Sequence, residues 1–249
     1  MLTDKFLTAI LKTPIMIEDK IDTYITRLCA WAPGIESPGE WEEWASGKRN
    51  ILPEVKSPDI SYTDSSFRRR LSQISKMTIH VIHGILPLGE DTKILFFSFR
   101  GELSREYQLF KMYTEEGELS PAAFSLSGFN TPVALASIAF GLKGGYSALY
   151  PAKNSFSACI KATQAALVSG KSDDIVLVYA DENIPSDCKY FFNNYPVPAA
   201  FCLLLSRNYQ ASSVSLSSLK TEEDNPLDFL KLLLMRGKIT DLFNNPVGC

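Results

Sequence analysis

The sequence lacks the short motifs that identify several common enzyme classes. It contains no G-x-S-x-G, the motif of the α/β-hydrolase nucleophile elbow. Its two histidines, His80 and His83, lie three residues apart, with neither an HExxH motif nor a carboxylate at ligand spacing. We therefore expect two structural imidazoles and no metal site. Residues 169–172 (SGKS) resemble the end of a Walker A loop, but Ala165 stands where its first glycine belongs, so we expect no phosphate loop and no cofactor.

Long apolar runs and a strong charge of either sign are also missing. No stretch approaches the roughly 20 apolar residues of a membrane span, and the apolar segment 6–11 is too short for a signal peptide. The net charge of −3 argues against a general nucleic-acid-binding protein. The five scattered cysteines include no C-x-x-C pair and predict reduced thiols instead of a disulfide framework. We expect a soluble, cytoplasmic protein with no membrane or nucleic-acid partner.

The stretch 144–181 organises the rest of the chain. Residues 146–150 form a short run of β-formers ended by a proline, and Ser155 or Ser157 can cap the helix that follows. Gly170 stands where a left-handed cap would end that helix. Residues 175–179 are continuously apolar, as expected of a strand covered on both faces. The pattern predicts a strand–helix–strand unit with a parallel sheet.

The same signals predict further elements on both sides of this unit. Strands are expected at 21–30, 93–99 and 199–206, with a weaker partner strand at 209–219. A helix with Trp41 and Trp44 on its core face follows a cap at Ser37. Capped or amphipathic helices are also expected at 67–85 after Ser65 or Ser66, at 105–113, at 131–141 after Asn130, and at 227–235.

The order of these motifs resembles that of the β-ketoacyl synthases, the condensing enzymes of the thiolase fold. The pattern S-P-x-x-F-S-x-S-x-x-N at 120–130, a helix of small residues, and G-L-x-G at 141–144 all match that family. The resemblance covers roughly residues 21–206. It implies an α/β fold: a thiolase-like half with a mixed, five-stranded-type sheet covered by helices in α/β/α layers. Residues 1–20 would be an N-terminal extension, and 21–249 one truncated ketosynthase-like domain.

The residue that would carry catalysis in this family is different here. The resemblance places the nucleophilic cysteine at Lys153, and Cys159 lies about two helical turns further along. A condensing mechanism requires a thiolate, because the acyl thioester must form before the carbon–carbon bond. The family's second half, which carries two catalytic histidines, has no counterpart in this sequence. We therefore expect no catalytic residue and no condensing activity.

These features are similar to those of short chain-length-factor-like subunits, which pair with a complete ketosynthase in polyketide and fatty-acid-like pathways of the aryl polyene type. The resemblance implies a heterodimer with that ketosynthase and an indirect interaction with acyl carrier protein. Phe99 falls at the family's acyl-pocket gate, and the strand ending at Tyr150 would pair with its counterpart in the partner. The remaining tunnel or interface candidates are Ala123, Phe124, Phe129 and Asn130, and the candidates for carrier-protein docking are Arg68, Arg69 and Arg70.

Other interpretations remain open from the residues alone. Buried phenylalanines are usually core, and charges at a helix end are usually solvated, so each candidate residue also has a structural explanation. The protein could instead be a stand-alone binding protein for acyl chains or acyl carrier protein. It could also be an acyltransferase in which Lys153 or a nearby serine is the nucleophile.

Overall fold

The computed structural model describes residues 22–54, 56–150, 155–170, 172–191, 197–219, 224–236 and 239–243. Position 153, where the nucleophile is expected, and the extension at 1–20 lie outside them. The strands are β1 (Tyr24–Trp31), β2 (Lys93–Phe97), β3 (Tyr146–Leu149), β4 (Asp174–Asp181), β5 (Ala199–Ser206) and β6 (Val214–Ser215). The α-helices are α2 (Pro38–Ala45), α3 (Ser65–Arg68), α4 (Gln73–His83), α5 (Leu103–Glu116), α6 (Pro121–Phe124), α7 (Thr131–Ala139), α8 (Ser155–Ser169), α9 (Pro226–Arg236) and α10 (Ile239–Phe243). Two short 3₁₀ segments are η1 (Ser186–Phe191) and η2 (Leu216–Ser218).

The strands form one mixed sheet in the order β3-β2-β4-β5-β1-β6. Strand β2 pairs in parallel with both β3 and β4, whereas the pairs β4–β5, β5–β1 and β1–β6 are antiparallel. The expected mixed sheet is confirmed, with six strands in the described part of the chain. The weak alternation at 209–219 yields only the two-residue β6, which pairs with β1.

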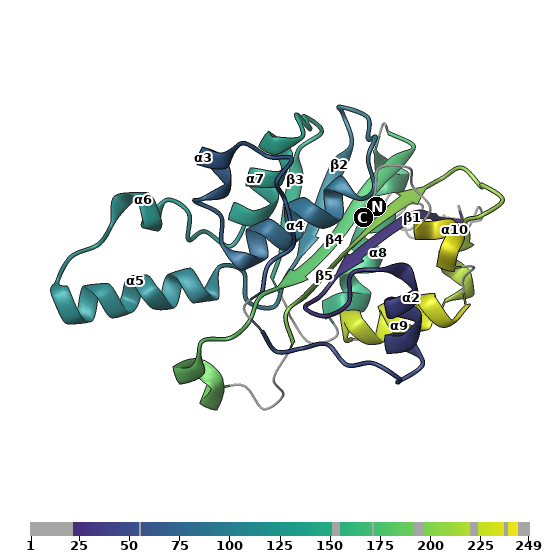
Figure 1. Ribbon diagram of the computed structural model, residues 1–249. Coiled ribbons are helices and arrows are strands. Elements are labelled where there is room, and N and C mark those ends of the chain that lie inside the picture. Colours follow the sequence, from purple (N-terminus) through teal and green to yellow (C-terminus); the bar gives the residue numbers. More distant parts are fainter. Residues whose placement is uncertain are drawn as a thin grey trace, which may run out of the picture.

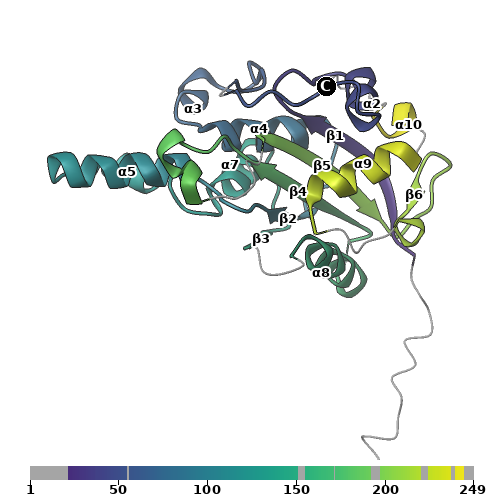
Figure 2. The same cartoon turned by 90° about the horizontal axis from the view of Figure 1, so that it is seen from below.

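Helices cover both faces of this sheet (Figures 1 and 2). One face packs against α4 and α7, through Ile74, Met77 and Val133. The other packs against α2, α8, α9 and α10, through Trp41, Phe156 and Phe229. The α/β/α arrangement is therefore confirmed, and alternate strand residues contribute to the two cores as the strand period requires. Helices α5 and α6 extend away from this body (Figure 1).

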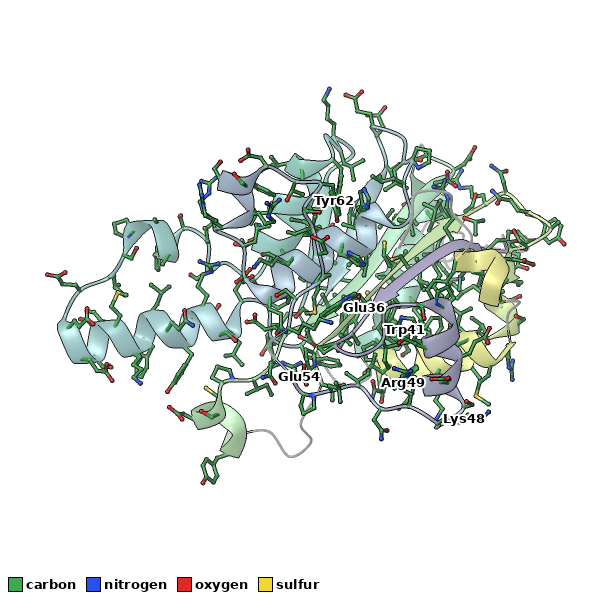
Figure 3. All side chains as sticks on the ribbon, in the orientation of Figure 1. Glu36, Trp41, Lys48, Arg49, Glu54 and Tyr62 are labelled. Atoms are coloured by element: carbon green, nitrogen blue, oxygen red, sulfur yellow. The ribbon has the colours of Figure 1, made fainter. Side chains whose placement is uncertain are left out.

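The first helix follows its sequence signals closely. Ser37 and Glu40 form a capping box at the start of α2, and Trp41 is fully buried. The indole Nε1 of Trp41 donates to the Ala30 carbonyl at 3.1 Å, and its ring packs edge-on against Trp44. Outside the core, Arg49 bridges Glu40 and Glu43; Trp41 and Arg49 are labelled in Figure 3. The expectation that the tryptophans pack in the core is confirmed.

The prediction of one long helix at 67–85 is wrong, because two capping residues start two separate helices in this segment. Asp64 accepts hydrogen bonds from the amides of Ser66 and Phe67, which starts the single turn α3. Ser72 accepts from the Ser75 amide and starts α4 anew. A side-chain acceptor satisfies the free N–H groups of a helix start, so Asp64 and Ser72 define two helices.

Two expected caps also act differently. The Asn130 side chain makes no capping hydrogen bond; its amide donates to the Tyr146 hydroxyl at 3.0 Å. Gly170 does not adopt a positive φ. A Cβ there would lie 2.7 Å from the Ala166 carbonyl oxygen, so close packing against α8 favours glycine at this position. The guanidinium of Arg207 completes the end of α8 by donating to the carbonyls of Leu167, Val168 and Gly170.

The cysteines correct one further expectation. Cys159, Cys188 and Cys202 are free, but Cys29 is disulfide-bonded, so the prediction of reduced thiols is wrong at that position. Among the described residues, no helix combines the length and apolar character needed to cross a membrane.

Candidate functional site

The carboxyl ends of the parallel strands β2, β3 and β4 lie close to the start of α8. We call this the carboxyl edge of the sheet, as distinct from its lateral edge at β3. In α/β sheets this carboxyl edge is where ligand sites usually form. The expected gate Phe99 follows β2, the expected interface residue Tyr150 follows β3, and Asp181 ends β4. The fold therefore brings three segments that are distant in sequence to one edge of the sheet.

A buried carboxylate fixes the turn that follows β2. Asp181 Oδ1 accepts from the hydroxyl of Ser98 at 2.7 Å, and from the backbone amides of Phe99 at 3.1 Å and Arg100 at 3.2 Å. The Ser98 hydroxyl in turn accepts from the amide of Gly101 at 2.8 Å. Because Asp181 and Ser98 are both fully buried, these hydrogen bonds connect the ends of β2 and β4 without competition from water.

The same carboxylate forms an ion pair with Arg100. The Arg100 Nη2 lies 3.4 Å from Asp181 Oδ2, and the two side chains are 4% and 0% exposed. Burial raises the pKa of Asp181, while Arg100 and the hydrogen bond from Ser98 act in the opposite direction. Removing one partner of such a buried pair is costly, because it leaves the other charge buried alone. The pair therefore makes this turn a rigid part of the carboxyl edge.

Phe99 is positioned by this turn on the face of the sheet that α8 covers. Its ring packs edge-on against Phe97, with centroids 5.0 Å apart, and against Tyr179 at 6.3 Å. It is only partly buried and lies at the margin of the core that contains Phe156. Its position is compatible with both a core role and the expected gate.

A second aromatic group lies toward the β3 edge. The Phe129 ring packs against Tyr150, with centroids 5.8 Å apart, and against Phe96 at 6.2 Å. Gly101 has φ +57°, and a Cβ there would lie 2.6 Å from the Phe129 ring, so this approach requires glycine. Together with the bond from Asn130 to Tyr146, the first residue of β3, these contacts place Phe129, Asn130 and Tyr150 along β3.

Ala123 and Phe124 lie apart from that group, on α6. The Ser120 hydroxyl caps α6 by accepting from the Ala123 amide, and the Phe124 side chain is 64% exposed. Phe124 lines an apolar groove of about 240 Å³ between α5 and α6. The other apolar residues of this α5–α6 groove are Leu109, Phe110, Tyr113 and Leu119.

The three consecutive arginines have separate environments. The Arg68 guanidinium donates to the carbonyls of Ile60, Ser61 and Thr63, which holds the preceding loop against α3. Arg69 and Arg70 are exposed beyond the end of α3. Their role in carrier-protein docking stays a prediction.

The histidines take structural positions on α4. His80 Nδ1 lies 3.3 Å from the Asp59 carbonyl oxygen, and burial lowers the pKa of His80. His83 stacks on Tyr62 with ring centroids 3.7 Å apart. No group of three potential metal ligands occurs among the residues that the structure describes.

Sequence reasoning missed the polar residues at the strand ends. Ser98, Arg100 and Glu102 follow one apolar strand, and Asp181 and Glu182 end another. The sequence signal was the presence of polar residues directly after two apolar strands, which meet at the carboxyl ends of the strands when those strands are parallel neighbours. The pairing of β2 with β4 was the missing information.

Comparisons with known proteins agree with this architecture. The model of the β-ketoacyl synthase N-terminal domain matches residues 41–229 of the 249-residue chain. The fold is that of a thiolase-like ketosynthase N-terminal half, and the chain belongs to the β-ketoacyl synthase N-terminal domain family. A search of curated proteins finds no match.

Several solved structures share this fold. A chain of a ketosynthase (ApeO) in complex with its chain length factor (ApeC) from Xenorhabdus doucetiae matches at 21% identity and a TM-score of 0.65, covering 88% of this chain and 94% of that one. The ishigamide ketosynthase/chain length factor matches at 12% identity and a TM-score of 0.62, with 76% and 62% coverage. A ketosynthase of the bacillaene synthase of Bacillus amyloliquefaciens matches at 14% and 0.52, with 78% and 43% coverage. The chain thus spans less than two thirds of the latter two.

Proposed function

We propose that this protein is a non-catalytic, chain-length-factor-like subunit that pairs with a complete ketosynthase and helps to shape its acyl tunnel, in polyketide or fatty-acid-like biosynthesis of the aryl polyene type. The observation that carries the proposal is an apolar face around the outer strand β3. The large hydrophobic side chains exposed on α7, on β3 and directly after β3 are Ile138, Tyr146 and Tyr150, and the separate α5–α6 segment exposes Phe110, Tyr113, Leu119 and Phe124. Large exposed apolar side chains beside an outer strand are typical of a protein–protein interface.

The position of β3 strengthens this argument. It is the first strand of the sheet order and pairs only with β2 among the described residues. An uncovered edge with aromatic side chains invites aggregation unless another chain pairs with it. A partner with the same fold could extend the sheet through its own edge strand.

The residues near the start of α8 argue against independent condensation. The family resemblance places Lys153 at the nucleophile position, and an amine would form a stable amide instead of a transferable thioester. The two histidines of this sequence lie on α4, which packs on the face of the sheet opposite α8. They are therefore not placed to act on a substrate held at the α8 start.

The solved structures with this fold support the choice of partner. They include ketosynthases with chain length factors, and in one case a type II polyketide synthase acyl-carrier protein in complex with its ketosynthase. We infer that acyl carrier protein meets the present subunit through the ketosynthase. The protein needs no cofactor for this role.

The test is co-purification with the ketosynthase encoded nearest to it, using a variant that blocks the β3 edge. The Gly145 carbonyl accepts from the Ile94 amide, so the amides of Tyr146 and Ala148 point away from β2 in a parallel pair. Ala148→Pro removes one outward amide, whereas Ala148→Ser keeps it and serves as the matched control.

We expect the wild-type chain and Ala148→Ser to co-purify with the ketosynthase, and Ala148→Pro to lose the complex while remaining folded. A wild-type chain that is monodisperse alone and never binds a ketosynthase would favour the stand-alone binding protein. Condensation of acyl thioesters by the purified chain alone would overturn the non-catalytic assignment.

A further inference from the structure

Helix α5 is attached to the body of the protein near its N-terminus, by contacts in its first turn and by a hydrogen bond from Tyr107 to Asp187. Of its 14 residues only Leu109 is buried, and the helix projects beyond the sheet (Figures 1 and 2). Most helices are held by an apolar face, which α5 lacks toward the body. Its orientation therefore depends on the polar contacts at its start.

One of these contacts is the buried carboxylate of Glu102. Its Oε1 accepts from the hydroxyls of Ser72 and Ser75, both at 2.7 Å, which ties α5 to the start of α4. Its Oε2 lies 3.3 Å from the Nε of Arg105 in the next turn. Glu102 is fully buried, and Arg105 is its ion-pair partner.

A second buried carboxylate, Glu182, lies on the other side of the same turn. Its Oε1 accepts from the Ser104 backbone amide at 2.8 Å, and the Ser104 hydroxyl donates to the Asn183 carbonyl at 3.1 Å. Glu182 lines a cleft of about 740 Å³ between α4, α5 and the segment after β4, and is only 2% exposed. We call Glu102, Ser104, Arg105 and Glu182 the α5 root.

The α5 root contains two buried carboxyl groups and one guanidinium, which is paired with Glu102. The start of α4 contributes only the uncharged Ser72, Gln73 and Ser75, and Arg70 contributes its carbonyl to Arg105. Lys111 on α5 also lines the cleft, and the neighbouring segments carry Glu106 on α5, Asp187 in η1 and Asp181 at the end of β4. Of these, Lys111 pairs with Glu115, Asp187 binds Tyr107, and Asp181 pairs with Arg100.

No cation in this set is paired with Glu182. Burial raises the pKa of Glu182 to about 7, the hydrogen bonds from Ser104 oppose the shift, and the nearby Glu102 adds to it. A carboxyl in this environment keeps its proton well above the ordinary glutamate range, because the ionised form would be a second buried negative charge beside Glu102.

We propose that the α5 root is a pH-sensitive hinge, in which a proton on Glu182 keeps α5 docked against α4 and the end of β4. When the root opens, solvent stabilises ionised Glu182, so the docked form of α5 loses stability as the pH rises from the ordinary glutamate pKa to about 7, and the loss levels off above that. Phe110 and Tyr113 move with α5, and the α5–α6 groove is therefore best formed below neutral pH. This inference does not depend on the proposed function.

The test is hydrogen exchange of the α5 amides at pH 6 and pH 8, with each rate divided by the intrinsic rate at that pH. Glu182 should titrate near the ordinary glutamate pKa when the root is open and near 7 when it is closed. Linkage then predicts that the protection of α5 falls about tenfold from pH 6 to pH 8. Amides of β5 provide the internal reference, because that strand is buried at every residue.

Glu182→Gln keeps an acceptor for the Ser104 amide without a charge, so α5 protection should become independent of pH. Glu115→Gln, in the exposed last turn of α5, is the matched control and should keep the wild-type fall. Glu102→Gln removes the neighbouring charge and should move the fall to lower pH, which tests the hinge even if Glu182→Gln does not fold. Constant protection in the wild type, or an unchanged fall in Glu182→Gln, would overturn the proposal.

Discussion

Strands β5 and β3 belong to the same sheet but have opposite surroundings. Every one of the eight residues of β5 is buried, and the strand lies between β4 and β1. None of the four residues of β3 is buried, and the strand lies at the end of the sheet. The difference separates two tasks: the centre of the sheet stabilises the fold, whereas its β3 edge leaves apolar groups exposed at the place where we propose that the partner binds.

The largest effect on stability is expected at the centre. Phe201 on β5 is fully buried and packs against Phe156 and Tyr179, with centroids 6.0 and 5.4 Å away. Phe201→Ala should lower the free energy of unfolding by about 3–5 kcal/mol, because it removes buried apolar surface and leaves a cavity. Urea denaturation measures the change. A loss no larger than that of the exposed Phe124→Ala would contradict the central role of β5.

A comparable loss of stability is expected at Asp181, at the end of β4, which lies between the central strand β5 and the strands β2 and β3. Asp181→Ala leaves Arg100 buried without its partner and removes the acceptor of the turn after β2, which should cost about 3–5 kcal/mol. Asp181→Asn keeps an acceptor oxygen and should cost less. Thermal and urea unfolding of both variants gives the comparison. Equal losses for the two would show that the hydrogen bonds contribute little beside the charge.

The contrast between centre and edge also explains what the sequence could predict. Continuous apolar runs placed β4 and β5 almost at their observed bounds, because burial on both faces leaves a clear pattern. Ser37 predicted the start of α2, because its cap depends on neighbouring residues alone. Local chemistry and strong burial are the two features that a single sequence reveals well.

Features that depend on competition or on distant residues were predicted less well. Asp64 and Ser72 divided an apparently continuous helix, because a local cap competed successfully with apolar periodicity. The Asn130 amide bonds to the distant Tyr146 instead of capping its own helix. Asp181 and the α5 root remained hidden, since their partners become neighbours only when β2 pairs with β4. The motif order predicted the family, while the geometry of the strand ends required the fold.

A smaller effect on stability is expected at Phe99. Its ring contacts Phe97 and Tyr179 but is only partly buried, so Phe99→Ala should cost about 1–3 kcal/mol, less than the range for a fully buried phenylalanine. If Phe99 also walls the acyl tunnel of the complex, the variant should shift carrier-bound products toward longer chains. Mass analysis of products from the reconstituted heterodimer measures this. An unchanged distribution with intact assembly would leave Phe99 with a core role alone.

The smallest effect on stability, and a large effect on assembly, is expected at the β3 edge. Tyr150 is 76% exposed, and its described ring contact is with Phe129, so Tyr150→Ala should change the free energy of unfolding by less than about 0.5 kcal/mol. In the proposed heterodimer the same side chain is an aromatic anchor, and its removal should weaken binding by about 2 kcal/mol. Calorimetric titration with the ketosynthase measures the second quantity.

The matched control for Tyr150→Ala is Tyr209→Ala, between β5 and β6 at the other end of the strand order. Tyr209 is 68% exposed, similar to Tyr150, and also has one described ring contact, with Tyr24. Both variants lose a mostly solvated ring, so their unfolding free energies should change equally little. Only Tyr150→Ala should then lose ketosynthase affinity, since Tyr150 lies beside β3, whereas Tyr209 lies beside β6 at the opposite end of the sheet. Equal affinities for the two variants would mean that the β3 edge is not the surface where the partner binds.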